Sequence, residues 1–127
     1  MREILFRGID EGTSEWVYGY YYECQKPSDF GGERRYYIFD DKTISKYNVI
    51  PKTVGQYIGI DDKNGTKIFE GDIVNCITSA FDGSDKYVYN YEITDITDFE
   101  QIGFLNFCHK IEIIGNIHDN PKLLKGE

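Results

Sequence analysis

Alanine is almost absent from this chain of 127 residues. It occurs once, at Ala80, whereas tyrosine occurs 11 times and phenylalanine 8 times. Alanine is the strongest helix former, and aromatic residues favour strands, so the composition disfavours a helical fold. Apolar runs near the roughly 20 residues that a membrane-spanning helix needs are also missing. The first residues lack the hydrophobic region of a signal peptide, so we expect a cytoplasmic protein without membrane contact.

Cysteine and histidine are too few and too scattered for a disulfide framework or a ribbon-type zinc site. The three cysteines are Cys24, Cys76 and Cys108, and no C-x-x-C spacing occurs. We therefore expect free, buried thiols in a reducing compartment. Cys108 and His109 are neighbours on an expected strand and would point to opposite faces, so they would not share a metal ion. We predict no metal site, including one built with Cys76 and His118, and no cofactor.

Basic side chains are outnumbered, 14 against 22 acidic ones, which gives a net charge of −8. Residues 61–100 alone carry 10 acidic and 3 basic side chains. Such a balance disfavours nonspecific binding to nucleic acid. We interpret the acidic stretch as a solvated face, with recognition of a basic partner as the alternative.

Alternation of apolar and polar residues dominates the rest of the chain and predicts strands. The predicted strands cover residues 4–7, 16–24, 35–39, 43–49, 53–60, 67–78, 87–93, 103–109 and 111–117. We expect loops over residues 27–32 and 80–86, and short helical turns over residues 94–101, capped by Thr94 or Asp95, and after Asn120-Pro121. Short strands with frequent turns are typical of barrels or curled sheets. A single domain over residues 1–127 fits the length.

Glycines mark the turns within this pattern. Asn64-Gly65 predicts the tip of a hairpin, because both residues tolerate a positive φ. Gly71 predicts a bend that interrupts the strand over residues 67–78, with Asp72 accepting a local backbone hydrogen bond. Gly19 predicts a bulge or a close approach of another backbone.

No constellation of side chains predicts catalysis. Cys76 or Cys108 with His118 is the thiol–imidazole pairing that the chain offers, and no local motif supports it. The carboxylate pairs, such as Glu70 with Asp72, have the positions of turn and cap residues. The loop at Asp62 to Gly65 fails as an EF-hand, because Ile60 and Gly71 occupy ligand positions. We predict that the chain is not an enzyme and has no catalytic, cofactor-binding or metal-binding residues.

The strand over residues 16–24 places Trp16, Tyr18, Tyr20, Tyr22 and Cys24 on one face. Such a row is typical of a core or of a contact between subunits. A stacking platform for single-stranded nucleic acid is the alternative, but such platforms lie in basic grooves, and the nearest basic pair is Arg34-Arg35.

Three blocks of sequence resemble the YopX-like proteins of bacteriophages and prophages. The first runs from Arg2 to Gly8, followed by Trp16-Val17-Tyr18-Gly19. The second runs from Val49 to Val74 and the third from Ile114 to Leu124. The resemblance implies a mostly β protein with several short curled antiparallel sheets, including an SH3-like barrel. It implies no activity and no catalytic residues.

These observations together predict a non-enzymatic accessory protein of a phage or prophage that acts through protein contacts in the bacterial host cytoplasm. Its partner would be a host or phage protein. A nucleic-acid-associated module is the alternative, by analogy with other SH3-like barrels, although nucleic acid is an unfavoured partner for so acidic a chain. A further alternative is an acidic DNA mimic that inhibits a host protein. We also expect a homo-oligomer, formed through the strand over residues 16–24 or the one over residues 87–91.

Overall fold

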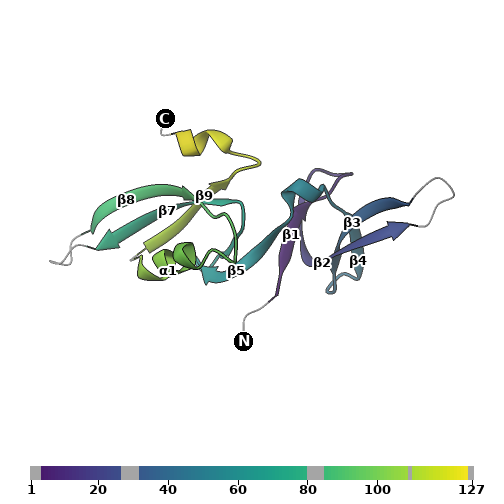
Figure 1. Cartoon of the computed structure of the whole chain (residues 1–127), viewed down its shortest axis with the longest axis horizontal. Coiled ribbons are helices and arrows are strands. Elements are labelled where there is room, and N and C mark those ends of the chain that lie inside the picture. The colour runs from purple at the N-terminus through teal and green to yellow at the C-terminus, as the bar shows by residue number, and fades with distance from the viewer. Residues whose placement is uncertain (1–3, 27–31, 80–84, 109, 126–127) are drawn as a thin grey trace. The chain divides into compact units, whose positions relative to one another are not determined.

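The computed structural model describes residues 4–26, 32–79, 85–108 and 110–125 (Figure 1). Most of these residues lie in strands of antiparallel sheets, with one α-helix and two 3-10 turns, which confirms the predicted all-β class. The SH3-like barrel stays a prediction. The elements are β1 (Phe6–Ile9), β2 (Trp16–Lys26), β3 (Glu33–Asp40), β4 (Ser45–Asn48), η1 (Pro51–Thr53), β5 (Gly55–Asp61), β6 (Lys67–Phe69), β7 (Asp72–Ser79), β8 (Asp85–Glu92), α1 (Phe99–Phe107), β9 (Lys110–Asn116) and η2 (Pro121–Lys125).

The chain divides into two compact units. Unit 1 comprises Met1–Gln56 and unit 2 comprises Tyr57–Glu127. The boundary falls within β5, whose first residues belong to unit 1 and whose remainder belongs to unit 2. The single domain expected over residues 1–127 stays a prediction.

Unit 1 is built on an antiparallel sheet with the order β4-β3-β2-β1, and the start of β5 pairs with β1. One face of this sheet forms the core of the unit. Ile38 and Val49 are buried there, and a side chain at Gly8 would lie 3.2 Å from both of them. β2 lies between β1 and β3 in the strand order: its residues 16–19 pair with β1, and its residues 20–26 pair with β3.

Gly19 has the close backbone approach that the sequence predicts. A Cβ at this position would lie 2.1 Å from the carbonyl oxygen of Phe39. This distance is far inside van der Waals contact, so the β2–β3 pairing requires glycine here.

Unit 2 contains a three-stranded antiparallel sheet with the order β8-β7-β9, and α1 packs beside it (Figure 1). Leu105 is the residue of α1 that is buried in the core, where its side chain packs against residues from four strands and from the segment after β8. The buried residues of this core are Ile58, Ile68, Val74, Cys76, Ile93, Leu105 and Ile111.

The hairpin and bend predicted from glycine positions are confirmed. β5 pairs with β6 through Tyr57 and Phe69, and Gly65 lies in the connecting turn with a φ of 82°. Gly71 has a φ of 91° and separates β6 from β7. The Asp72 carboxylate accepts a hydrogen bond of 2.8 Å from the backbone N–H of Phe69, which holds this bend.

The prediction of a strand over residues 103–109 is wrong. Residues 99–107 form α1, and Cys108 is its C-cap. The helix predicted over residues 94–101 begins later, because the side chain that caps it is Asp98, which accepts a hydrogen bond from Gln101 N–H. Gly103 and three phenylalanines disfavour a helix locally. Burial of Gln101 and Leu105, one turn apart, overrides that preference.

Other boundaries move by a few residues. The first strand is β1, which starts at Phe6 rather than at residue 4, and β8 begins at Asp85, within the connection predicted over residues 80–86. Residues 27–31 of the predicted loop lie outside the described residues. In the part of the chain that the structure describes, no helix has the length and apolar character needed to cross a membrane.

Candidate functional site

The outer face of the unit 1 sheet presents a row of tyrosines. Tyr18, Tyr20 and Tyr22 alternate along β2 and are 46%, 52% and 40% exposed. Alternate residues of a strand point to the same side, about 7 Å apart. Cys24 continues the row and is exposed, so the predicted burial of this thiol is wrong.

Strand pairing adds aromatic rings and cations to the same face. Across an antiparallel pair, directly opposite residues share a face. Tyr20 lies opposite Phe39, and Phe39 lies opposite Lys46. Tyr22 lies opposite Tyr37, with their ring centroids 5.2 Å apart. We call this surface the tyrosine face: Arg7, Trp16, Tyr18, Tyr20, Tyr22, Cys24, Arg35, Tyr37, Phe39 and Lys46.

Two cations of the tyrosine face rest on aromatic rings. The Arg7 guanidinium lies 4.4 Å from the centroid of the Trp16 ring, and the Lys46 ammonium lies 4.5 Å from that of Tyr37. Contacts of this kind orient a cation without neutralising its charge. Lys46 is exposed, whereas Arg7 is buried in the sheet. The face thus combines exposed rings with a fixed positive charge.

The charge of the tyrosine face is opposite in sign to that of the chain. Arg7, Arg35 and Lys46 lie on it, and the register places Glu33 on the same side, paired with Arg35 at 2.9 Å. Most of the acidity lies elsewhere: residues 57–127 carry 13 acidic and 6 basic side chains, a net charge of −7.

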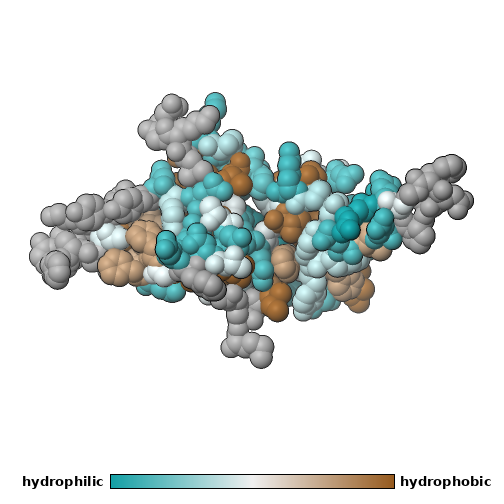
Figure 2. All heavy atoms as spheres, in the orientation of Figure 1, coloured by the Kyte–Doolittle hydropathy of each residue, from teal (hydrophilic) through white to brown (hydrophobic). Residues whose placement is uncertain are grey.

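Figure 2 shows hydrophobic residues in separate groups among hydrophilic ones on the side in view.

A hollow of about 340 Å³ lies beside β4, between Lys46 and the turn that follows β1. Its lining residues are Asp10, Glu11, Gly12, Lys46, Tyr47 and Asn48. The Asp10 carboxylate accepts hydrogen bonds from the Gly12 N–H at 3.1 Å and from the Thr13 hydroxyl at 3.0 Å. These bonds shape the turn, so the carboxylate has a structural role.

Two of the three thiols meet in unit 2. The Cys76 thiol donates a hydrogen bond to the Cys108 sulfur, and both are free cysteines. Burial raises the pKa of Cys76 to about 12 and also raises the pKa of Cys108. Both therefore stay protonated at neutral pH, when a thiol is a poor nucleophile. Because Cys108 caps a helix, the argument that it alternates with His109 on a strand is wrong.

Metal-ligating side chains do not gather within the described ranges: no three of His, Cys, Asp and Glu lie close enough there to hold an ion. His118 lies in the turn after β9, where its backbone N–H donates to Asn116 Oδ1 at 3.0 Å. His109, the remaining metal-site candidate, lies outside the described residues.

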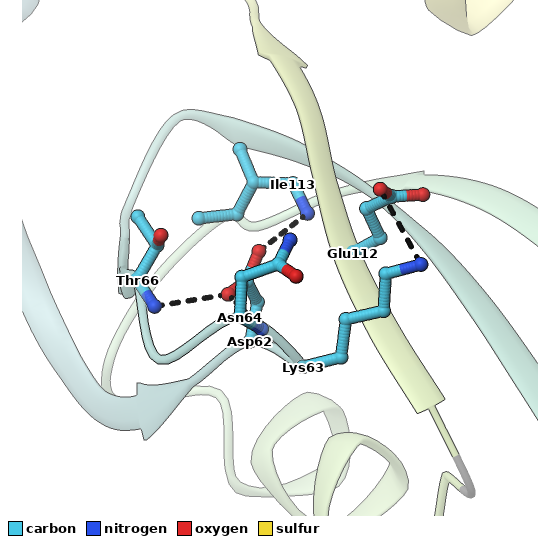
Figure 3. Close-up of polar contacts among 6 residues, drawn as sticks. All are labelled: Asp62, Lys63, Asn64, Thr66, Glu112 and Ile113. Atoms are coloured by element: carbon cyan, nitrogen blue, oxygen red, sulfur yellow. Dashed lines mark hydrogen bonds and ion pairs between the residues drawn. The ribbon is translucent and has the colours of Figure 1, made fainter.

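Asp62 lies in the turn that the sequence predicts between residues 61 and 66, and it also bonds a distant strand (Figure 3). Its Oδ1 accepts hydrogen bonds of 2.9 Å from the backbone N–H groups of Asn64 and Thr66, and its Oδ2 accepts one of 3.2 Å from that of Ile113 on β9. The Lys63 N–H donates to the Ile111 carbonyl at 2.8 Å. Asp62 thereby ties the hairpin tip to β9, and this role is structural. The long-range bond to Ile113 leaves no local signal in the sequence.

Gln101 is a second buried polar residue, and the sequence does not predict the role of its side chain. Its Oε1 accepts from Thr94 N–H at 2.9 Å, and its Nε2 donates to the Glu92 carbonyl at 2.9 Å. The side chain thus fastens α1 to the end of β8. Its polar atoms are used within the fold, as expected for a buried amide.

The protein is therefore an antiparallel β protein built of two small units. Its hairpin turns at Gly65, and Asp62 bonds this hairpin to β9. The model of the YopX family, described as YopX protein, matches residues 5–125. The chain therefore belongs to the YopX family.

Two further comparisons add little to this assignment. Among solved structures, the chain is similar to protein EF1440 from Enterococcus faecalis, known from a crystal structure. The two are 20% identical, with a TM-score of 0.44, and the match covers 98% of this chain and 99% of that chain. The comparison with curated proteins finds no significant match.

Proposed function

We propose that this YopX-family chain is a non-enzymatic accessory protein that acts by contact through the tyrosine face. The observation that carries the proposal is the exposed row of Tyr18, Tyr20 and Tyr22 on β2, a strand that pairs with β1 and β3. Tyrosine is enriched where proteins bind other molecules, because its ring offers apolar area and its hydroxyl remains hydrated. A phage or prophage origin and a place in the host cytoplasm complete the proposal, on the family resemblance.

Three kinds of partner follow from the sequence: a host or phage protein, a second copy of the chain, or nucleic acid. The sequence alone favours protein contact. In a second copy, β2 would contribute mainly its face, because its residues 16–19 already pair with β1 and its residues 20–26 already pair with β3. β8 is an outer strand of its sheet and would offer an edge. The cations beside the tyrosines favour nucleic acid as a second candidate.

Capture from a bacterial host lysate tests the contact function. The immobilised full chain is compared with Tyr20→Ser, with Tyr20→Phe, and with Arg34→Ser, which alters an exposed residue on the opposite side of the same sheet. We expect a molecule that the wild type, Tyr20→Phe and Arg34→Ser retain and that Tyr20→Ser loses. An identical set of retained molecules for all four proteins would contradict the proposal.

A further inference from the structure

The tyrosine face combines two features that the sequence keeps apart. Its exposed rings come from β2, whereas its exposed cation comes from β4, two strands away. Arg34-Arg35, the basic pair nearest to the tyrosines in sequence, is divided by the pleat: Arg35 lies on the tyrosine face and Arg34 on the opposite one. Pairing of β2, β3 and β4 thus places positive charge beside the rings.

We propose that the tyrosine face binds single-stranded nucleic acid, an assignment that rests on the contact function proposed above. Tyr18, Tyr20 and Tyr22 would each present a ring on which a base can stack, along a row of about 14 Å. Lys46 and Arg35 would contact the phosphates that pass beside the row.

Charge complementarity selects this partner over a second copy of the chain. Each copy would bring the same net positive face, so a symmetric contact through it would bring two faces of like charge together. A polyanion instead meets the cations with the opposite sign. The net charge of −7 on residues 57–127 weakens nonspecific attraction, so binding depends on the rings as well as on charge.

The rings favour single strands over duplexes. Stacking needs the π-face of an unpaired base, which a duplex hides within its own stack. The tyrosines carry no hydrogen-bond pattern that reads one base, so the expected binding tolerates different sequences. An oligothymidine of about 12 nucleotides is a suitable probe, because it forms no competing secondary structure.

Fluorescence anisotropy with the labelled oligothymidine and the full chain tests the assignment. We expect binding at about 50 mM salt that weakens towards about 200 mM, with a slope of log K against log salt near −1.4 for two phosphate contacts. Tyr20→Ser should weaken binding by about 5- to 150-fold, as the loss of one stacking ring does. Tyr20→Phe keeps the ring and should bind like the wild type.

Lys46→Ala and Lys42→Ala form a matched pair, since both remove one positive charge from the β3–β4 hairpin. Lys46 lies on the tyrosine face and Lys42 in the turn. Lys46→Ala should make the salt slope shallower by about 0.7, and Lys42→Ala should leave it unchanged. Equal slopes for the two variants would overturn the phosphate contact.

Three results would overturn the nucleic-acid assignment: no binding of the oligothymidine at low salt, equal affinity for a duplex of the same length, or equal affinity of Tyr20→Ser and the wild type. The contact function fails separately. A protein that the wild type retains from nuclease-treated lysate, and that Tyr20→Ser loses, would keep the contact function and overturn the nucleic-acid assignment.

Discussion

Replacement of Asp62 by alanine removes the acceptor of three backbone N–H groups at once. Asp62 is 8% exposed, and its two oxygens serve Asn64, Thr66 and Ile113 (Figure 3). Asn64 and Thr66 are exposed, so water can replace the carboxylate at their N–H groups. Ile113 is half-buried on β9, and its N–H is harder to hydrate.

The expected loss of stability follows from these exposures. A hydrogen bond to a charged group contributes about 1.5–3 kcal/mol, and we assign this value to the half-buried Ile113 N–H. The two exposed N–H groups add about 0.5–1 kcal/mol each. Asp62→Ala should therefore destabilise the protein by about 2.5–5 kcal/mol, which lowers the melting temperature by about 4 °C per kcal/mol.

Thermal unfolding followed by circular dichroism measures this loss, and hydrogen exchange at the Ile113 amide locates it. Lys63→Ala is the control, because its ion pair with Glu112 at 3.5 Å joins side chains that are both 44% exposed. Such a pair contributes at most about 1 kcal/mol. The reasoning is refuted if the free energy of unfolding of Asp62→Ala lies within about 0.5 kcal/mol of the wild-type value. It is also refuted if Lys63→Ala lowers the free energy of unfolding as much as Asp62→Ala does.

Three further predictions concern the turn, the thiols and assembly. Gly65→Val should cost about 1–2 kcal/mol in chemical denaturation, because the φ of 82° strains a branched side chain even though space is open there; an unchanged midpoint would contradict this. Alkylation of the folded protein at neutral pH should modify Cys24 first, and equal labelling of Cys24 and Cys76 would count against the burial of Cys76. The stability of the protein should fall as the pH rises from about 9 towards 12, because the Cys76 thiol ionises in this window in the unfolded chain but not in the folded one. Light scattering tests the homo-oligomer expected from the sequence, and a mass near 14.8 kDa at all salt concentrations would establish a monomer.

Local rules predicted much of this fold. Sequence pattern identified β2, β3 and β9, which overlap the strands predicted over residues 16–24, 35–39 and 111–117. Glycine positions identified the hairpin at Gly65 and the bend at Gly71, since a positive φ is a local requirement. The turn after Asn120 followed from the same kind of local rule.

The helix α1 was predicted only in part: the helix expected over residues 94–101 overlaps its first turn, and its continuation to Phe107 was missed. Its phenylalanines and Gly103 favour a strand locally, and the burial that overrides them, against residues of β7, is not a local signal. The roles of Asp62 and Gln101 escaped for the same reason, since their decisive partners belong to other elements.

The candidate site could be predicted only in part. The tyrosine row of β2 follows from alternation alone. The placement of Lys46 beside it depends on the register of β3 and β4, which the sequence does not specify. Without that register, the exposed Lys46 cannot be placed beside the tyrosines, and the acidic composition disfavours nucleic acid.

Amide chemical shifts of the full chain, recorded while an oligothymidine of about 12 nucleotides is added, test the central claim most directly. The account predicts shifts at Tyr18, Tyr20 and Tyr22 and at their cross-strand neighbours, including Lys46, with β9 unaffected. Shifts confined to residues 57–127, or no shifts at all, would contradict it.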